Sequence, residues 1–352
     1  MALWFRRVGQ LLAVGVVCVA TLWPFYQVAQ QQLTRAELAR IDAQPGISRS
    51  SYQPRLDQLQ QTADFSTLAS GEMAGRRPGQ PGSELARQFL QRRFTELGLI
   101  PAGTDGFAQK YQTDGQSDGV NFIGKINGTA AQLPAIVVTA HYDHVGVHQE
   151  RMYPGADDNA SGVAALLALA AYFQAHPPRH SLIFAAVDHE EQGMHGSKQL
   201  FAGKVLQPAQ LALNVNLDML SRDTKAQLFA VGTYQHPALL PLLQPLQQDS
   251  LVALRFGHDR PATLAGRVQD WSDASDHGNF AAEGVPFVYF GVPDHVDYHQ
   301  PTDTFERADI GFYHKVSDTI LSALLLLDQA DLTALRQKTD RCQRGDKSEL
   351  VK

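Results

Sequence analysis

The chain has 352 residues, of which 44% are hydrophobic and 19% are charged, as is typical of a globular protein. The formal net charge is −6 and there is no sustained run of Lys or Arg, so we expect no nucleic-acid partner. Cys18 lies in an apolar segment and Cys342 in a polar tail, a distribution that indicates neither a disulfide framework nor a cysteine metal site. The length allows one large α/β domain or two small domains.

The N-terminus begins with an apolar segment. Arg6 and Arg7 precede the apolar stretch 8–29, and the next charged residue is Arg35. A basic stretch followed by an apolar one is typical of an export signal or a membrane anchor, with a buried core helix as the alternative. Residues 1–29 are therefore predicted to be a membrane anchor or signal peptide, lying in or through the inner membrane. The lack of a small-x-small cleavage site in the sequence favours an uncleaved anchor. The body of the protein is then exported and faces the periplasm.

The remainder of the chain divides into three predicted regions. Residues 30–70 are polar and Gln-rich and contain Pro45 and Pro54, which indicates a juxtamembrane connector with some helix. Residues 71–335 are predicted to form a single catalytic domain. Residues 336–352 are predicted to be a polar tail.

Apolar runs and helical patterns alternate through the predicted domain. The sequence predicts strands at 121–126, 135–143, 181–191, 212–220, 227–232 and 285–292. It predicts helices at 84–98, 162–175, 193–202 and 317–335. Nearly continuous apolar strands separated by helices predict an α/β fold with a mainly parallel mixed sheet sandwiched between helices.

Acidic and imidazole side chains gather where the predicted strands end. Ligands of open α/β sheets bind beyond the carboxyl ends of the strands, so these side chains are expected to converge. Five segments contribute them: His141 and Asp143, Asp157 and Asp158, Glu190 and Glu191, Asp218, and His299.

Each of these segments also has an ordinary interpretation. A lone glutamate pair is more often a solvated strand end, and a lone loop histidine such as His299 is more often not a ligand. His141 and Asp143 equally fit a surface imidazole–carboxylate pair. Asp218 is harder to explain in this way, because it is flanked by Leu217 and Met219 and a buried carboxylate needs a partner or a cation.

Taken together, the five segments favour a metal site. Their His, Asp and Glu side chains, without cysteine, form a nitrogen and oxygen donor set that suits zinc or a similar divalent ion. Five ligands exceed the three that one catalytic zinc requires. Two metals that share one carboxylate would use all five, which is the arrangement of a two-metal hydrolase.

The motifs resemble a known family. The chain resembles the co-catalytic zinc aminopeptidases of peptidase family 28, clan MH, which also contains glutamate carboxypeptidases. The resemblance covers about residues 71–335. Six segments carry it, in the family's order: GRRPGQPG, AHYDHVG, YPGADDNASG, DHEEQGMHGS, NLDML and DYHQPTDT.

The resemblance implies two zinc ions and a role for each site residue. His141 and Asp218 would bind one zinc, and Glu191 and His299 the other. Asp157 would bridge the two, with a cis peptide bond between Asp157 and Asp158. Asp143 would orient His141, and Glu190 would act as the general base. Supporting or structural roles are implied for the remaining members of these motifs: His144, His189, His195, Asp276, His277 and Asp303.

The function implied by the resemblance is that of an exported zinc-dependent aminopeptidase. Its substrate would be a peptide with a free N-terminus. Three alternatives stay open, namely a carboxypeptidase, a single-zinc glutaminyl cyclase-like relative, and a non-catalytic binding protein on the same scaffold. The presence of every expected ligand and of the base counts against the last two. The sequence indicates no particular oligomeric state.

Overall fold

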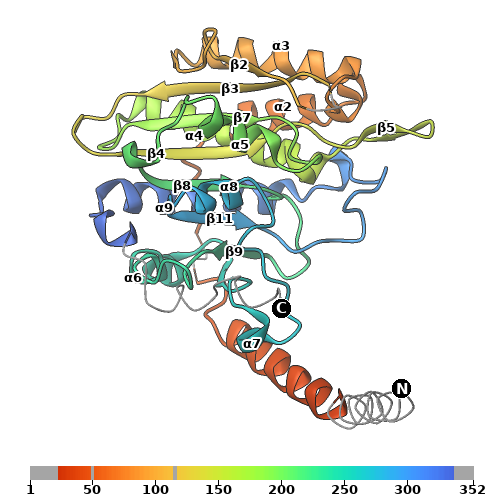
Figure 1. Ribbon diagram of the computed structural model, residues 1–352, viewed down its shortest axis with the longest axis vertical. Coiled ribbons are helices and arrows are strands. Elements are labelled where there is room, and N and C mark those ends of the chain that lie inside the picture. Colours follow the sequence, from red (N-terminus) through yellow and green to blue (C-terminus); the bar gives the residue numbers. More distant parts are fainter. Residues whose placement is uncertain (1–22, 49–50, 114–116, 337–352) are drawn as a thin grey trace, which may run out of the picture. The chain divides into compact units, whose positions relative to one another are not determined.

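The computed structural model describes residues 23–48, 51–113 and 117–336 (Figure 1). The predicted N-terminal apolar segment up to residue 22 and the tail beyond 336 lie outside these residues. The described chain divides into two compact units. One contains the residues up to Gln44 together with Arg260–Asp270, and the other contains Pro45–Asp259 and the residues from Trp271 onward.

The smaller unit consists of a helix over 23–42 and a short segment that contains helix α7 (Ala262–Ala265). The Thr34 hydroxyl accepts a hydrogen bond from the main-chain N–H of Arg267 at 2.8 Å. Gly266 lies against the same stretch of the helix with a φ of 65°, where a Cβ atom would come within 2.4 Å of Thr34 Oγ1. The glycine therefore allows the segment to approach the helix closely.

The larger unit is built on a mixed sheet. In the described part of the chain this sheet has nine strands, in the order β1-β3-β7-β4-β8-β11-β9-β10, with β2 paired to β3. The strands are β1 (Ile100–Pro101), β2 (Ala108–Tyr111), β3 (Gly119–Ile126), β4 (Ala135–His141), β7 (Leu182–Val187), β8 (Leu211–Leu217), β9 (Gln227–Val231), β10 (Ala253–Phe256) and β11 (Phe287–Gly291). A separate hairpin pairs β5 (Gly146–His148) with β6 (Arg151–Tyr153).

The centre of the sheet is parallel. Strands β7, β4, β8 and β11 are neighbours and pair in parallel, whereas β3 and β9 flank them in antiparallel orientation. The four central strands are buried along almost their whole length, which explains their continuous apolar sequences. This architecture confirms the predicted mixed sheet between helices. The short strands β1, β2 and β10 and the β5–β6 hairpin were not predicted.

Helices cover both faces of the sheet (Figure 1). Helices α2, α3, α4 and α9 enclose the main core on one face, and α5 and α8 enclose a smaller core on the other. Alternate residues of β4 divide between the two cores, with Val138 in the first and Val137 in the second. The longer helices are α2 (Gln58–Leu68), α3 (Pro81–Glu96), α4 (Gly162–Ala175), α5 (His195–Ala202), α8 (His277–Ala282) and α9 (Ile310–Gln329). Shorter helical segments are η1 (Gly71–Arg76), η2 (Ala156–Ser161), η3 (Pro208–Gln210), α6 (Leu239–Leu243), η4 (Gln244–Asp249), η5 (Phe305–Arg307) and η6 (Thr333–Arg336).

The last long helix begins earlier than the sequence pattern predicted. Helix α9 begins at Ile310 because Asp309 caps it, accepting a hydrogen bond from the main-chain N–H of Phe312 at 2.9 Å. Among the described residues, α9 is the one helix that is long and apolar enough to cross a membrane, with 61% of its apolar window buried inside the protein. Its residues Ile320 and Leu324 are fully buried in the main core. Core packing therefore accounts for its apolar sequence.

Candidate metal centre

The four central strands deliver the polar side chains to one edge of the sheet. Strand β4 ends at His141, β7 leads into Asp188–Glu191, β8 leads into Asp218, and β11 leads into the loop that carries His299. Because the strands are parallel neighbours, their carboxyl ends meet at this edge.

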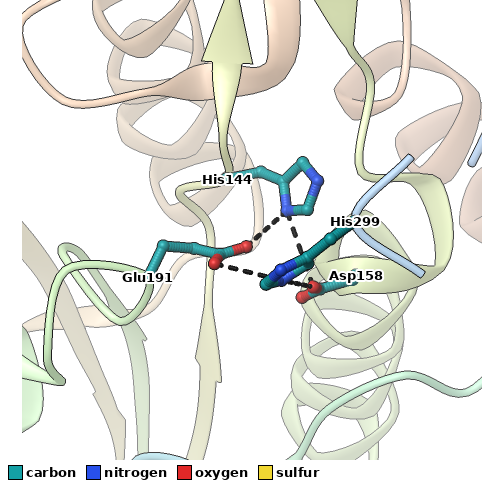
Figure 2. Close-up of side chains that lie close together, drawn as sticks. All are labelled: His144, Asp158, Glu191 and His299. Atoms are coloured by element: carbon teal, nitrogen blue, oxygen red, sulfur yellow. Dashed lines mark ion pairs between the residues drawn. The ribbon is translucent and has the colours of Figure 1, made fainter. Parts of the chain in front are cut away.

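Two groups of possible metal ligands lie at this edge. In the first, Nε2 of His141 is 3.3 Å from Oδ1 of Asp158 and 3.3 Å from Oδ1 of Asp218. In the second, Nε2 of His299 is 3.0 Å from Oδ2 of Asp158 and 3.1 Å from Oε2 of Glu191, and His144 completes the group (Figure 2). Asp158 belongs to both groups and turns one carboxylate oxygen toward each.

The position of Asp158 corrects the expectation that Asp157 bridges two metals. The Asp157 carboxylate is occupied elsewhere: Oδ1 accepts the main-chain N–H of Ser221 at 2.6 Å, and Oδ2 lies 3.0 Å from Nε2 of His295. The cis peptide bond is also one residue later than expected, between Asp158 and Asn159. Spacing in the sequence does not distinguish two adjacent acids in a turn, because the backbone path alone decides which one faces the site.

Asp143 holds the histidine ligand through its main chain. The carbonyl oxygen of Asp143 lies 3.2 Å from Nδ1 of His141, so a proton on Nδ1 leaves the Nε2 lone pair directed at Asp158 and Asp218. The Asp143 carboxylate instead accepts the main-chain N–H groups of Glu190, at 3.0 Å, and Glu191, at 3.4 Å. Asp143 therefore connects the ends of β4 and β7.

Glu190 belongs to neither group of possible ligands among the described residues. Burial raises the pKa of its carboxyl well above the ordinary range, and nearby acids such as Asp276 and Asp218 add to the rise against the opposing effect of His141. A carboxyl group with a raised pKa that is not a ligand is suited to accepting and returning a proton.

The donor set fits a divalent cation. The carboxylates of Asp158 and Asp218 are buried and that of Glu191 is half-buried beside them, an arrangement that is costly unless a cation or a protonated partner neutralises the charge. Nδ1 of His144 forms an ion pair with Oε1 of Glu191, and Nε2 of His144 is buried without a hydrogen-bond partner in the described chain. Imidazole and carboxylate donors gathered at one place, with no sulfur donor, match the ligand chemistry of zinc.

A buried arginine connects the loops around the site. Arg76 has no exposed surface and donates hydrogen bonds of 2.6–2.8 Å to four main-chain carbonyls: those of Leu68, Tyr142, Pro154 and Gly155. Burial lowers the pKa of its guanidinium to about 10, so the group stays charged at neutral pH. Sequence reasoning included Arg76 in the GRRPGQPG motif but assigned it no role, because its acceptors are main-chain atoms.

Two further acids support the site. Asp303 accepts the main-chain N–H groups of Asp157, at 3.1 Å, and Asp158, at 3.2 Å, so it joins the ligand turn to the segment after His299. Asp276 is fully buried, and burial raises its pKa to about 6. His277, His189 and His195 enter neither group of possible ligands in the described chain.

Comparison with known proteins agrees with this geometry. Among curated relatives, a probable zinc metalloprotease of Pyrenophora teres f. teres is 28% identical over 304 residues, covering 79% of this chain and 62% of that protein. A vacuolar membrane protease of Clavispora lusitaniae is 30% identical over 158 residues, covering 43% of this chain and 15% of that protein. The chain thus spans less than two thirds of the length of either relative.

Solved structures share the fold. An aminopeptidase from Aneurinibacillus sp. strain AM-1 matches with a TM-score of 0.60 at 17% identity, over 77% of this chain and 93% of that one. A glutaminyl cyclase from Porphyromonas gingivalis matches with a TM-score of 0.62 at 16% identity, over 77% of this chain and 99% of that one. The family model of peptidase family M28 matches residues 121–324, which include every expected ligand. The chain therefore belongs to peptidase family M28, as its sequence motifs predicted.

Proposed function

We propose that the chain is a zinc-dependent aminopeptidase with two metal positions. The observation that carries the proposal is the shared carboxylate of Asp158, which faces His141 with one oxygen and His299 with the other. The zinc metalloprotease relative and the structural similarity to an aminopeptidase support it.

The proposal assigns ligands to both positions from the two groups of possible ligands. The first position is held by His141, Asp158 and Asp218, and the second by Asp158, Glu191 and His299. When bound, two zinc ions supply positive charge that activates a water molecule and polarises the scissile carbonyl.

Glu190 moves the proton in this proposal. Its carboxylate accepts a proton from the attacking water and returns it to the nitrogen of the leaving amine. The raised pKa caused by burial favours this exchange, because it makes the Glu190 carboxylate a stronger base. Asp143 positions Glu190 through the hydrogen bond to its main-chain N–H.

We also propose that residues 71–335 form the peptidase domain and that the N-terminal segment associates it with a membrane. The basic and apolar sequence of residues 1–29 supports an anchor or signal peptide that places the domain on the periplasmic face. The similarity to a vacuolar membrane protease is consistent with membrane association. The larger unit begins at Pro45 and α2 packs in its core, so the connector predicted over residues 30–70 is shortened to the residues before Pro45. Residues 336–352 would form a polar tail.

Hydrolysis of a panel of amino-acyl anilides by the purified chain tests the activity. We expect release of aniline from free-amine substrates, none from N-acetylated ones, and loss of activity when a chelator removes the metal. Chelator-insensitive activity, or inactivity on every free-amine substrate, would contradict the proposal. Cyclisation of N-terminal glutamine with one zinc per chain would instead favour the glutaminyl cyclase-like alternative, and cleavage only at a free C-terminus would favour a carboxypeptidase.

A further inference from the structure

His144 belongs to the second group of possible ligands and follows the expected ligand His141 by three residues in the sequence. Its side chain has no exposed surface. Nδ1 is 2.6 Å from Oε1 of Glu191 and 3.6 Å from Oδ2 of Asp158. Figure 2 shows this nitrogen turned toward the other three side chains of the second group. The sequence predicted only a structural or supporting role for His144, because the residue lies beside an expected ligand.

His144 and Glu191 form a short ion pair. Nδ1 of His144 is 2.6 Å from Oε1 of Glu191, close enough for the two atoms to share a proton. Nε2 of His144 is buried without a hydrogen-bond partner in the described chain. An imidazole and a carboxylate that lie beside Asp158 and His299 can share a proton or coordinate a cation, and these nitrogen and oxygen donors suit zinc.

The ring of His144 has little room to turn away from this point. It packs against Gly155, where a Cβ atom would lie 2.4 Å from Cγ of His144. Gly155 also has a φ of 61°, which favours glycine independently. The imidazole is thus held in place before any metal binds, as is required of a ligand in a preorganised site.

We propose that His144 is a fourth protein ligand of the second metal position, through Nδ1, beside Asp158, Glu191 and His299. The four candidate donor atoms lie within 4.8 Å of one another. The first position has three protein donors, of which one is an imidazole, and the second has four, of which two are imidazoles. Each position includes two carboxylates, so the two positions differ in donor number but not in charge. The second position is expected to retain its zinc longer during chelation. The inference depends on the proposed function only in assuming that zinc binds there.

Metal binding by the full-length chain tests the inference without measuring turnover. We would compare wild type with His144→Ala, His144→Asn and, as a control at an expected ligand, His299→Asn, by chelator competition. Loss of a ligand should lower the affinity for one zinc ion by more than about 100-fold and leave the affinity for the other unchanged. We expect this result in both His144 variants, as in the control. Asn is informative because its side-chain amide can still donate a hydrogen bond to Glu191 from about the place of Nδ1.

The opposing outcomes are distinct. Wild-type affinity in His144→Asn, with weaker binding only in His144→Ala, would show that His144 merely positions Glu191 and would overturn the inference. X-ray absorption of the wild-type chain loaded with one equivalent of cobalt gives a second measurement that needs no variant. It should show two imidazoles at the tight position, and one imidazole would overturn the inference. A wild type that binds two zinc ions but cleaves no peptide would contradict the proposed function alone.

Discussion

Oδ2 of Asp157 lies 3.0 Å from Nε2 of His295, and this pair connects the turn that carries Asp158 to the loop that carries His299. Burial opposes protonation of His295, but the carboxylate of Asp157 outweighs it and raises the histidine pKa, so the contact is a charge-assisted hydrogen bond. Asp157 therefore positions the possible ligands, and Asp158 faces the two metal positions.

Exchanging each aspartate for asparagine should separate these two roles. Asp158→Asn removes charge from both metal positions, so we expect zinc content after dialysis to fall toward zero. Asp157→Asn keeps the ligands but weakens their positioning, which should lower zinc affinity by about 10–100-fold. Zinc per chain, measured by elemental analysis against free zinc concentration, checks this order. A greater loss in Asp157→Asn would restore Asp157 as the bridging acid.

Glu190→Gln should separate catalysis from metal binding. The variant lacks a proton acceptor, so turnover of amino-acyl anilides should fall by about 10²–10⁴-fold. Zinc content should stay at the wild-type value, because Glu190 belongs to neither group of possible ligands. Glu191→Gln is the matched control and should lose one zinc. If Glu190→Gln lost zinc and Glu191→Gln did not, the two assignments would have to be exchanged.

Removal of the metal should destabilise the fold as well as abolish activity. Without a cation, the buried carboxylates at the sheet edge repel one another, and a bound metal stabilises the native state by mass action. We expect a chelator to lower the thermal unfolding midpoint and added zinc to restore both this midpoint and activity. An unchanged midpoint on full removal of zinc would place the metal away from the buried carboxylates at the sheet edge.

Arg76→Met should be strongly destabilising. It leaves four main-chain carbonyls without their donor inside the protein, a loss of at least about 3 kcal/mol in the free energy of unfolding. Arg76→Lys keeps the charge but not the planar set of donors, so its free energy of unfolding should lie between those of wild type and Arg76→Met. Urea unfolding measures both. Arg77→Met is the neighbouring control, since Arg77 is only half-buried and its side chain donates a hydrogen bond to the main-chain carbonyl of Val145 at 3.1 Å.

His236 should make stability depend on pH below neutrality. Burial lowers its pKa from 6.5 to about 4, so the unfolded chain binds the proton more readily than the folded one. The neutral His236 side chain makes its full contribution to the free energy of unfolding above about pH 6.5. This contribution, a total of about 3 kcal/mol, is lost as the pH falls toward 4. Urea unfolding at several pH values should give a shallower dependence for His236→Leu than for wild type. An equal dependence of stability on pH in the two proteins would refute the assignment of this effect to His236.

The sequence predicted the central sheet because its strands are long, apolar and buried. It missed β1, with two residues, and the hairpin β5–β6, whose strands have three residues each and are largely exposed. These elements have no apolar run to mark them. The long core helix was recognised, but its start depended on the cap at Asp309 rather than on hydrophobicity.

The chemistry of the site was predictable to the level of segments. Strand ends rich in His, Asp and Glu indicated where the centre lies, but the roles of Asp157 and Asp158 depended on contacts with Ser221 and His295, which are distant in sequence. The same holds for Arg76, whose acceptors are main-chain carbonyls. Such tertiary contacts follow from the folded backbone and leave no local pattern in the sequence.

The order of strands in the sheet has a consequence for the life of the protein. The possible ligands follow β4, β7, β8 and β11, and β11 is the last strand of the described chain although it lies beside β8 within the sheet. A nascent chain that has not yet inserted β11 lacks His299 and the loop around it. The proposed peptidase activity would therefore require a chain that is complete through this loop, with the last strand in place.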